Sequence, residues 1–116
     1  DKCPTNAITE PFVINSNLCI AYHTIENREE DIPIHIEKKL NGWIAGCDIC
    51  QDICPWNKSV PPNNEPEAET KEWIKNLDMN AIEWKDEEWA ERLKDNTFKR
   101  IKPWMWRRNI KAAIKS

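Results

Sequence analysis

Glycine is scarce in this chain: only two of its 116 residues are glycines, so it contains no glycine-rich loop of the kind that holds phosphate groups. No apolar stretch approaches the length of a membrane span, and nothing at the N-terminal end resembles a signal peptide. The sequence also shows no nucleophile with a neighbouring base and no pair of facing carboxylates. We therefore expect no membrane contact and no catalytic residue in this chain.

Cysteine is not abundant either, but its spacing is informative. Cys47, Cys50 and Cys54, the last followed by proline, stand at the C-x2-C-x3-C-Pro spacing that closes an iron–sulfur binding run, and Cys3 is likewise followed by proline. In the full bacterial run, C-x2-C-x2-C-x3-C-P, the fourth cysteine ligates the other cluster of a pair. The spacing therefore predicts cluster binding and also indicates which cysteines share a cluster.

The first cluster can be assigned by this crossover rule. Cys47 and Cys50 belong together, and Cys3, the last cysteine of an upstream run, crosses over to join them. The downstream run lacks its first cysteine because Ile44 occupies that position, which leaves Cys19 as the fourth ligand. We predict one complete [4Fe–4S] site, formed by Cys3, Cys19, Cys47 and Cys50.

The total of five cysteines thus divides into four and one, as expected for a chain cut inside the upstream run. Cys54 is predicted to ligate a second [4Fe–4S] cluster, whose other ligands would lie before residue 1. Three other interpretations are a structural zinc site, a disulfide scaffold and buried structural thiols. The C-x3-C-Pro tail disfavours zinc, the odd cysteine total disfavours disulfides, and the regular spacing disfavours buried thiols. Free cysteines at metal-binding spacing, without secretory features, predict a cytoplasmic protein.

Three stretches of the sequence, residues 3–8, 17–26 and 46–57, resemble the iron–sulfur part of epoxyqueuosine reductase. The stretch Arg107-Arg108-Asn109-Ile110 resembles the C-terminal helix of that family, and the sixteen positions from Cys3 to Cys19 match its spacing. The resemblance implies an electron-relay part of an oxidoreductase that reduces epoxyqueuosine to queuosine in tRNA with two [4Fe–4S] clusters and cobalamin.

By the same resemblance, the cobalamin is not bound by this fragment, which we expect to be monomeric and inactive alone. The electron donor is not predicted. The alternatives to this function are a 4Fe-4S electron-transfer module of another oxidoreductase and, with less support, a structural zinc domain.

The composition divides the chain into three parts and predicts a mainly α fold. Residues 1–58 form a ferredoxin-like cluster-binding segment, residues 59–66 a proline-rich linker, and residues 67–116 a small helical subdomain. Residues 11–14 are expected to be extended, and 67–77 helical. Helices are predicted to begin at Pro33 and Pro103, and Asp86 is predicted to cap another. Ile32, Ile36 and Leu40 should form the apolar face of the first of these helices.

The chain carries a formal net charge of −3, yet no acidic residue occurs from Thr97 to Ser116. This stretch is predicted either to face RNA phosphates or to pack on the acidic helix before it. The candidate RNA contacts are Arg107 and Arg108 first, and then Lys99, Arg100, Lys102 and Lys111.

Tryptophan is plentiful, with seven residues. Trp43 and Trp56 flank the cysteine loop and are expected either to shield the cluster from solvent or to fill the core. Three more, Trp73, Trp84 and Trp89, are predicted core residues. Trp104 and Trp106, which lie among basic residues, are predicted either to pack in the core, the favoured role, or to contact RNA. Neither His23 nor His35 has ligand spacing to the cysteines.

Overall fold

A computed structural model describes residues 2–58, 61, 72–75, 77–94 and 96–115. Within these ranges the chain is mainly helical and has one two-stranded sheet, which confirms the predicted mainly α class. The predicted linker 59–66, apart from residue 61, lies outside the described residues. So do residues 67–71 and 76 of the predicted helix 67–77. The elements are β1 (Ile8–Glu10), β2 (Val13–Ile14), η1 (Ser16–Leu18), η2 (Tyr22–Glu26), α1 (Ile34–Glu37), α2 (Ile49–Asp52), η3 (Pro55–Asn57), α3 (Glu72–Lys75), η5 (Met79–Glu83), α4 (Asp86–Leu93), η6 (Thr97–Arg100) and α5 (Pro103–Lys115).

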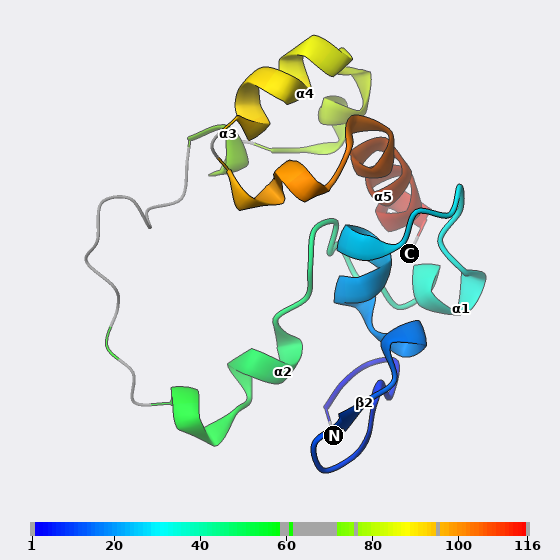
Figure 1. Cartoon of the computed structure of the whole chain (residues 1–116), viewed down its shortest axis with the longest axis vertical. Coiled ribbons are helices and arrows are strands. Elements are labelled where there is room, and N and C mark those ends of the chain that lie inside the picture. Colours follow the sequence, from blue (N-terminus) through cyan, green and yellow to red (C-terminus); the bar gives the residue numbers. More distant parts are fainter. Residues whose placement is uncertain (1, 59–60, 62–71, 76, 95, 116) are drawn as a thin grey trace.

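The N-terminal residues form a short antiparallel hairpin. β1 pairs with β2 through Ile8 opposite Ile14 and Glu10 opposite Val13, with an irregularity between the two pairs. The extended conformation predicted for residues 11–14 is therefore present at Val13–Ile14. The hairpin and α2 lie at the end of the molecule away from α4 (Figure 1).

One hydrophobic cluster surrounds α1. Ile32, Ile36 and Leu40 are all buried, as their spacing predicted, and they gather with Ile20 and Ala112. Pro33 stands at the N-cap of α1, so the predicted start of this helix is confirmed. The chain turns after Leu40 through two left-handed residues, Asn41 and Gly42, with φ of 47° and 89°. That turn leads directly into the cysteine loop.

A second hydrophobic cluster holds the C-terminal helices together. Its buried members come from η5, α4, α5 and the segment before α5, and they include Trp89, Leu93, Met105 and Trp106. α5 begins at Pro103 as predicted. The predicted cap at Asp86 is wrong by one residue, because Lys85 is the N-cap of α4 and Asp86 is its first helical residue.

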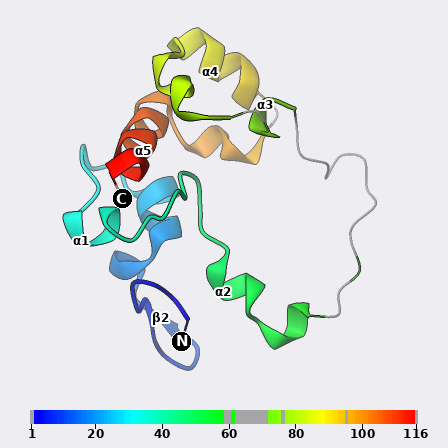
Figure 2. The same cartoon turned by 180° about the vertical axis from the view of Figure 1, so that it is seen from behind.

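Helix α5 connects the two clusters. Ile110 belongs to the cluster around α4, whereas Ala112, two residues later, belongs to the cluster around α1. Two residues further along a helix lie on clearly different faces, so one short helix can serve both clusters. Figure 2 shows α5 between α4 and α1 from the opposite side. Among the described residues, no helix is long and apolar enough to cross a membrane.

The segment after Cys19 departs from a regular α-helix. Residues 22–26 form a π-helix, in which the wider turn moves successive side chains off the usual spacing. Leu18, Tyr22 and Ile25 recur at the spacing of one face of a regular helix, yet all three are only partly buried. The buried positions are instead Ile20, His23, Thr24 and Asn27, three of them polar.

Candidate metal centre

Three separate segments carry the five cysteines, all of them free thiols. Cys3 precedes the hairpin, and Cys19 follows η1. The third segment contains Cys47 before α2, Cys50 inside it and Cys54 just after it. Cys50 is exposed, and the other four are partly buried. Such thiols can ligate a metal cluster without deep burial of charge.

The pKa of the Cys47 thiol reflects both its burial and the charges of other thiols. Burial raises the pKa of the Cys47 thiol above its ordinary value, although the backbone N–H of Ile49 opposes this by hydrogen bonding. The negative charges of Cys3, Cys50 and Cys19 raise the pKa of Cys47 further. Of the other four thiols, these three are the ones whose charges act on Cys47.

Cys3 lies in a small pocket of hydrogen-bond donors. Burial by itself would raise its pKa, but hydrogen bonds from the Thr5 side chain and from the backbone N–H groups of Ala7, Thr5 and Asn6 outweigh this and lower the pKa of Cys3. Thr5 Oγ1 and the Ala7 nitrogen each lie 3.4 Å from Cys3 Sγ. Donors arranged around a sulfur favour its thiolate form, which is the form that binds metal.

The cysteine-bearing segments are tied to one another by hydrogen bonds. Thr5 Oγ1 lies against both Cys3 Sγ and the carbonyl of Leu18, next to Cys19, so its one proton is shared between the two acceptors. Gly46, next to Cys47, donates its N–H to Thr24 Oγ1 at 2.9 Å. Gly46 has φ of 83°, a left-handed conformation that glycine adopts readily. These hydrogen bonds fix the three cysteine-bearing segments relative to one another.

The donor chemistry fits an iron–sulfur cluster. Within the described ranges, no group of three or more Cys, His, Asp or Glu side chains is close enough to hold one metal ion. In a cubane cluster each thiolate binds a different iron, so the sulfurs need not converge on one point. The four grouped residues are all thiols, and one of them has a lowered pKa.

The histidines lie outside this group of thiols. His23 is buried, and its Nε2 lies 2.7 Å from the Asn17 carbonyl oxygen. Its Nδ1 lies 2.9 Å from Asn27 Nδ2, so both ring nitrogens have partners. His35 is exposed. Neither side chain is positioned as a ligand, in agreement with its sequence spacing.

The two arginines first proposed for RNA are used inside the fold. Arg108 is 9% exposed, and its guanidinium donates to the carbonyls of Asn27, Glu29 and His23. Burial, and then the charge of Arg28, lower the pKa of Arg108. These contacts leave little of the Arg108 guanidinium for an external phosphate, and they join it to residues 23–29 and not to the acidic helix, so neither predicted role describes this residue.

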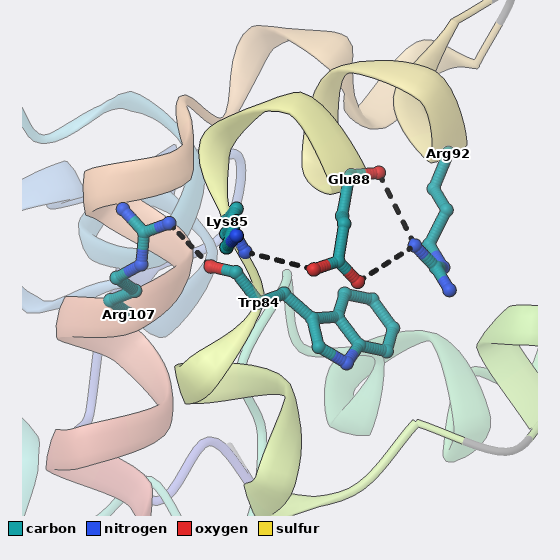
Figure 3. A network of polar contacts seen from close by, with 5 residues as sticks. All are labelled: Trp84, Lys85, Glu88, Arg92 and Arg107. Carbon is teal, nitrogen blue, oxygen red and sulfur yellow. Dashed lines mark hydrogen bonds and ion pairs between the residues drawn. The ribbon is translucent and has the colours of Figure 1, made fainter.

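Arg107 packs against the start of α4. It donates to the Trp84 carbonyl at 2.6 Å and pairs with Asp86 at 2.7 Å. Figure 3 shows the contact with Trp84. It also shows Glu88, whose side chain accepts from the Lys85 backbone N–H at the start of α4 and pairs with Arg92 one turn later. Arg100 pairs with Glu26 on the segment that follows Cys19. Arg100 remains exposed despite this ion pair, as do the other candidates for RNA, Lys99, Lys102 and Lys111.

The tryptophans divide between core and surface. Trp89 and Trp106 are fully buried, and Trp73 and Trp84 pack against them from partly buried positions. Trp104 is 42% exposed, so its predicted core role is wrong. Both predicted roles for Trp56 are also at odds with the structure, because it is 88% exposed; its flanking partner Trp43 is partly buried against the α1 cluster.

Sequence reasoning missed three polar residues that organise the centre: Thr5, Thr24 and Asn109. The first two hydrogen-bond beside the cysteines, and Asn109, fully buried, donates to the carbonyls of Thr24 and Ile44. A usable signal existed for Asn109, because it lies three residues after Trp106 on the apolar stripe of α5. A polar residue on such a stripe needs buried partners.

Comparison with known proteins gives a consistent result. Residues 1–57 match the family described as the 4Fe-4S double cluster binding domain. The epoxyqueuosine reductase of Synechococcus sp. (strain CC9605) is 52% identical over 97% of this chain and 36% of that protein. The epoxyqueuosine reductase of Prochlorococcus marinus (strain NATL2A) is 52% identical over 99% of this chain and 38% of that protein. The corresponding protein of Synechocystis sp. (strain ATCC 27184 / PCC 6803 / Kazusa) is 45% identical over 98% of this chain and 40% of that protein.

The chain therefore spans somewhat more than a third of the length of these relatives. No solved structure matches it. The resemblance inferred from residues 3–8, 17–26 and 46–57 is confirmed, and so is the assignment of an iron–sulfur binding domain.

Proposed function

Because the chain belongs to the epoxyqueuosine reductase family, of whose members it spans more than a third, we propose that it is the electron-relay part of a reductase that converts epoxyqueuosine to queuosine in tRNA. The observation that carries the proposal is that hydrogen bonds join the three cysteine-bearing segments, through Thr5 to Leu18 and through Gly46 to Thr24. An electron-transfer module of another oxidoreductase would need the same thiols, but the names of the relatives favour the reductase.

The ligands of one complete [4Fe–4S] cluster in this proposal are Cys3, Cys19, Cys47 and Cys50. Cys54 ligates a second cluster, in keeping with the crossover of the fourth cysteine in two-cluster runs. Cys54 follows α2, whereas Cys47 precedes it, which supports placing Cys54 on a different cluster.

When bound, a [4Fe–4S] cluster supplies one electron at a time. The chain's own residues hold the thiolates that bind it. The N–H groups around Cys3 favour its thiolate form, and exposed Cys50 leaves one side of the centre open to solvent or to another protein surface. A protein changes a cluster's potential through such hydrogen bonds to sulfur and through solvent exposure.

The remaining parts of the proposal concern the rest of the protein. Residues 1–58 act as the ferredoxin-like cluster segment, residues 59–66 as a linker, and residues 67–116 as a helical subdomain. Cobalamin and the pocket for the modified nucleoside are assigned to parts of such a reductase outside this chain. The proposed location is the cytoplasm, and the proposed macromolecular partner is tRNA.

Lys99, Lys102 and Lys111 are the proposed tRNA contacts in this chain. All three are exposed, and they belong to the stretch that carries no acidic residue. Lysine side chains on such a surface attract phosphates without sequence specificity and would help to hold the tRNA in place.

Anaerobic reconstitution with iron and sulfide tests the cluster assignment. We expect about four iron atoms and about four sulfides per chain, because one complete set of thiolates is present. A parallel incubation with zinc measures competition for the same thiols. Tight zinc binding without iron uptake would favour the structural zinc domain, and about eight iron atoms per chain would contradict the division of ligands.

A further inference from the structure

Helix α5 reaches the cysteine-bearing segments through Asn109. This side chain has no exposed surface. Its Nδ2 donates to the Thr24 carbonyl and to the Ile44 carbonyl, both at 2.8 Å. Its Oδ1 accepts from Arg108 Nε at 3.0 Å. Both amide hydrogens and the amide oxygen therefore have partners, which fixes the orientation of the group.

The neighbouring Arg108 holds the same segment from the other side. Its NH1 donates to the Asn27 carbonyl at 2.7 Å and the Glu29 carbonyl at 2.9 Å, and its NH2 donates to the His23 carbonyl at 2.8 Å. The His23 carbonyl lies within the π-helix and the other two lie just after it, near the helix end that carries partial negative charge. A buried guanidinium satisfies that charge and holds the end of the segment against α5.

Thr24 joins this contact to the cysteine loop. Its hydroxyl accepts from the Gly46 N–H at 2.9 Å and donates to the Ile20 carbonyl at 2.9 Å. Cys19 directly precedes Ile20, and Cys47 directly follows Gly46. The segments of Cys19 and Cys47 are thus connected at two points, once directly through Thr24 and once through Asn109.

We propose that Thr24 and Asn109 are positioning residues for the iron–sulfur cluster, because they fix the separation of Cys19 and Cys47 before the cluster binds. The inference rests on the ligand set of the proposed function. It makes α5, which follows the predicted linker, a structural part of the metal centre. A cubane needs its thiolates at set separations, and partly buried loops maintain them only when other contacts hold the backbone.

Asn109 needs a polar side chain because it hydrogen-bonds two backbone carbonyl groups. Met105, Trp106 and Ile110 are buried around this part of α5, so an apolar residue would suit the packing. It would, however, leave the Thr24 and Ile44 carbonyls buried without this donor. The same reasoning applies to Thr24, since valine has nearly its shape but cannot accept from Gly46.

The test compares variants that preserve shape. Thr24→Val removes the hydroxyl, Thr24→Ser keeps it, and Asn109→Asp removes both amide donors. Leu93→Ala on α4 is the control for general destabilisation. Each variant is assayed at the same interval below its own melting temperature, so that differences in stability are matched. Each reconstituted chain is assayed for the rate of iron loss to a chelator and for the midpoint potential of the cluster.

We expect Thr24→Val and Asn109→Asp to lose iron about tenfold faster than the unmodified chain, with a shifted potential, and Thr24→Ser to restore both values. Leu93→Ala should leave the potential unchanged. Wild-type rates and potentials in Thr24→Val would overturn the inference, as would the same change in Leu93→Ala. If Asn109→Asp does not fold, the Thr24 pair decides the outcome.

Cys19→Ser and Cys47→Ser, assayed in parallel, separate this inference from the proposed ligand set. If both leave the cluster intact, the ligand set is wrong and the positioning role is overturned with it. If both disrupt the cluster while Thr24→Val has no effect, the ligand set stands and only the positioning role is wrong.

Discussion

The indole rings of Trp89 and Trp106 stack with their centroids 5.0 Å apart and their planes inclined by 14°. Trp89 comes from α4 and Trp106 from α5, so the stack joins the two longest helices of the described chain. Trp84 and Phe98 pack around it at centroid distances of 4.8 Å from Trp89 and 6.0 Å from Trp106. This aromatic cluster holds in place the helix that contacts the cysteine-bearing segments.

Trp106→Ala should therefore lower the free energy of unfolding by about 3 to 5 kcal/mol, as expected when a large buried aromatic residue is lost. Trp106→Phe should cost clearly less. Among the described residues, Trp106 Nε1 is buried without a hydrogen-bond partner, and removing an unpaired donor offsets part of the lost packing. Urea unfolding of the two variants measures the difference. Equal losses would contradict the packing role assigned to this aromatic ring.

The stretch from Thr97 to Ser116 was expected either to contact RNA or to pack on the acidic helix. The two roles predict that different substitutions affect stability and RNA affinity. Arg107→Ala should lower the free energy of unfolding by about 1 to 2 kcal/mol, because it removes the contacts with the Trp84 carbonyl and Asp86. Its effect on RNA affinity should be small by comparison. Thermal unfolding and binding of an anticodon stem-loop RNA at low salt measure the two quantities.

Combined substitution of Lys99, Lys102 and Lys111 by alanine should instead weaken RNA binding and reduce the slope of log affinity against log salt by about 2. A control with alanine at Lys38, Lys39 and Lys58 removes the same charge from other exposed positions. Equal effects of the two triple variants would indicate that only net charge matters, and the assigned tRNA surface would then be wrong.

The thiols of Cys3 and Cys47 should differ in their pH dependence in the metal-free chain. The pKa of Cys3 is lowered and that of Cys47 is raised, so Cys3 becomes a thiolate at lower pH. The rate of alkylation by iodoacetamide, followed for each cysteine by peptide mass spectrometry, should therefore rise at lower pH for Cys3. Thr5→Val should move the Cys3 profile to higher pH, because it removes a hydrogen bond to the sulfur. Coincident profiles for the two cysteines would contradict these assignments.

The assignment of cysteines to clusters comes from the sequence alone and stays a prediction. The crossover rule links Cys3 to Cys47 and Cys50 because ligand spacing follows cluster geometry and does not depend on the surrounding fold. Local rules also placed the starts of α1 and α5, where proline precedes or opens the helix. These features depend on neighbouring residues or on metal chemistry, so they can be read without the tertiary structure.

Long-range polar contacts could not be predicted in this way. Arg108 and Asn109 bond to backbone groups some eighty residues earlier, and nothing in the local pattern separates a buried guanidinium from one that faces RNA. The π-helix of residues 22–26 likewise gave a buried face that regular helical spacing does not indicate. Trp56, beside the cysteines, was expected to shield the cluster or to fill the core, but its side chain is exposed.

The iron content of Cys19→Ser and Cys54→Ser after anaerobic reconstitution tests the central claim most directly. The account predicts that Cys19→Ser disrupts the cluster, because Ile44 leaves no other thiol for the fourth position. Cys54→Ser should retain about four iron atoms per chain, because Cys54 is assigned to the second cluster. Loss of the cluster in Cys54→Ser, with full iron content in Cys19→Ser, would contradict the assignment.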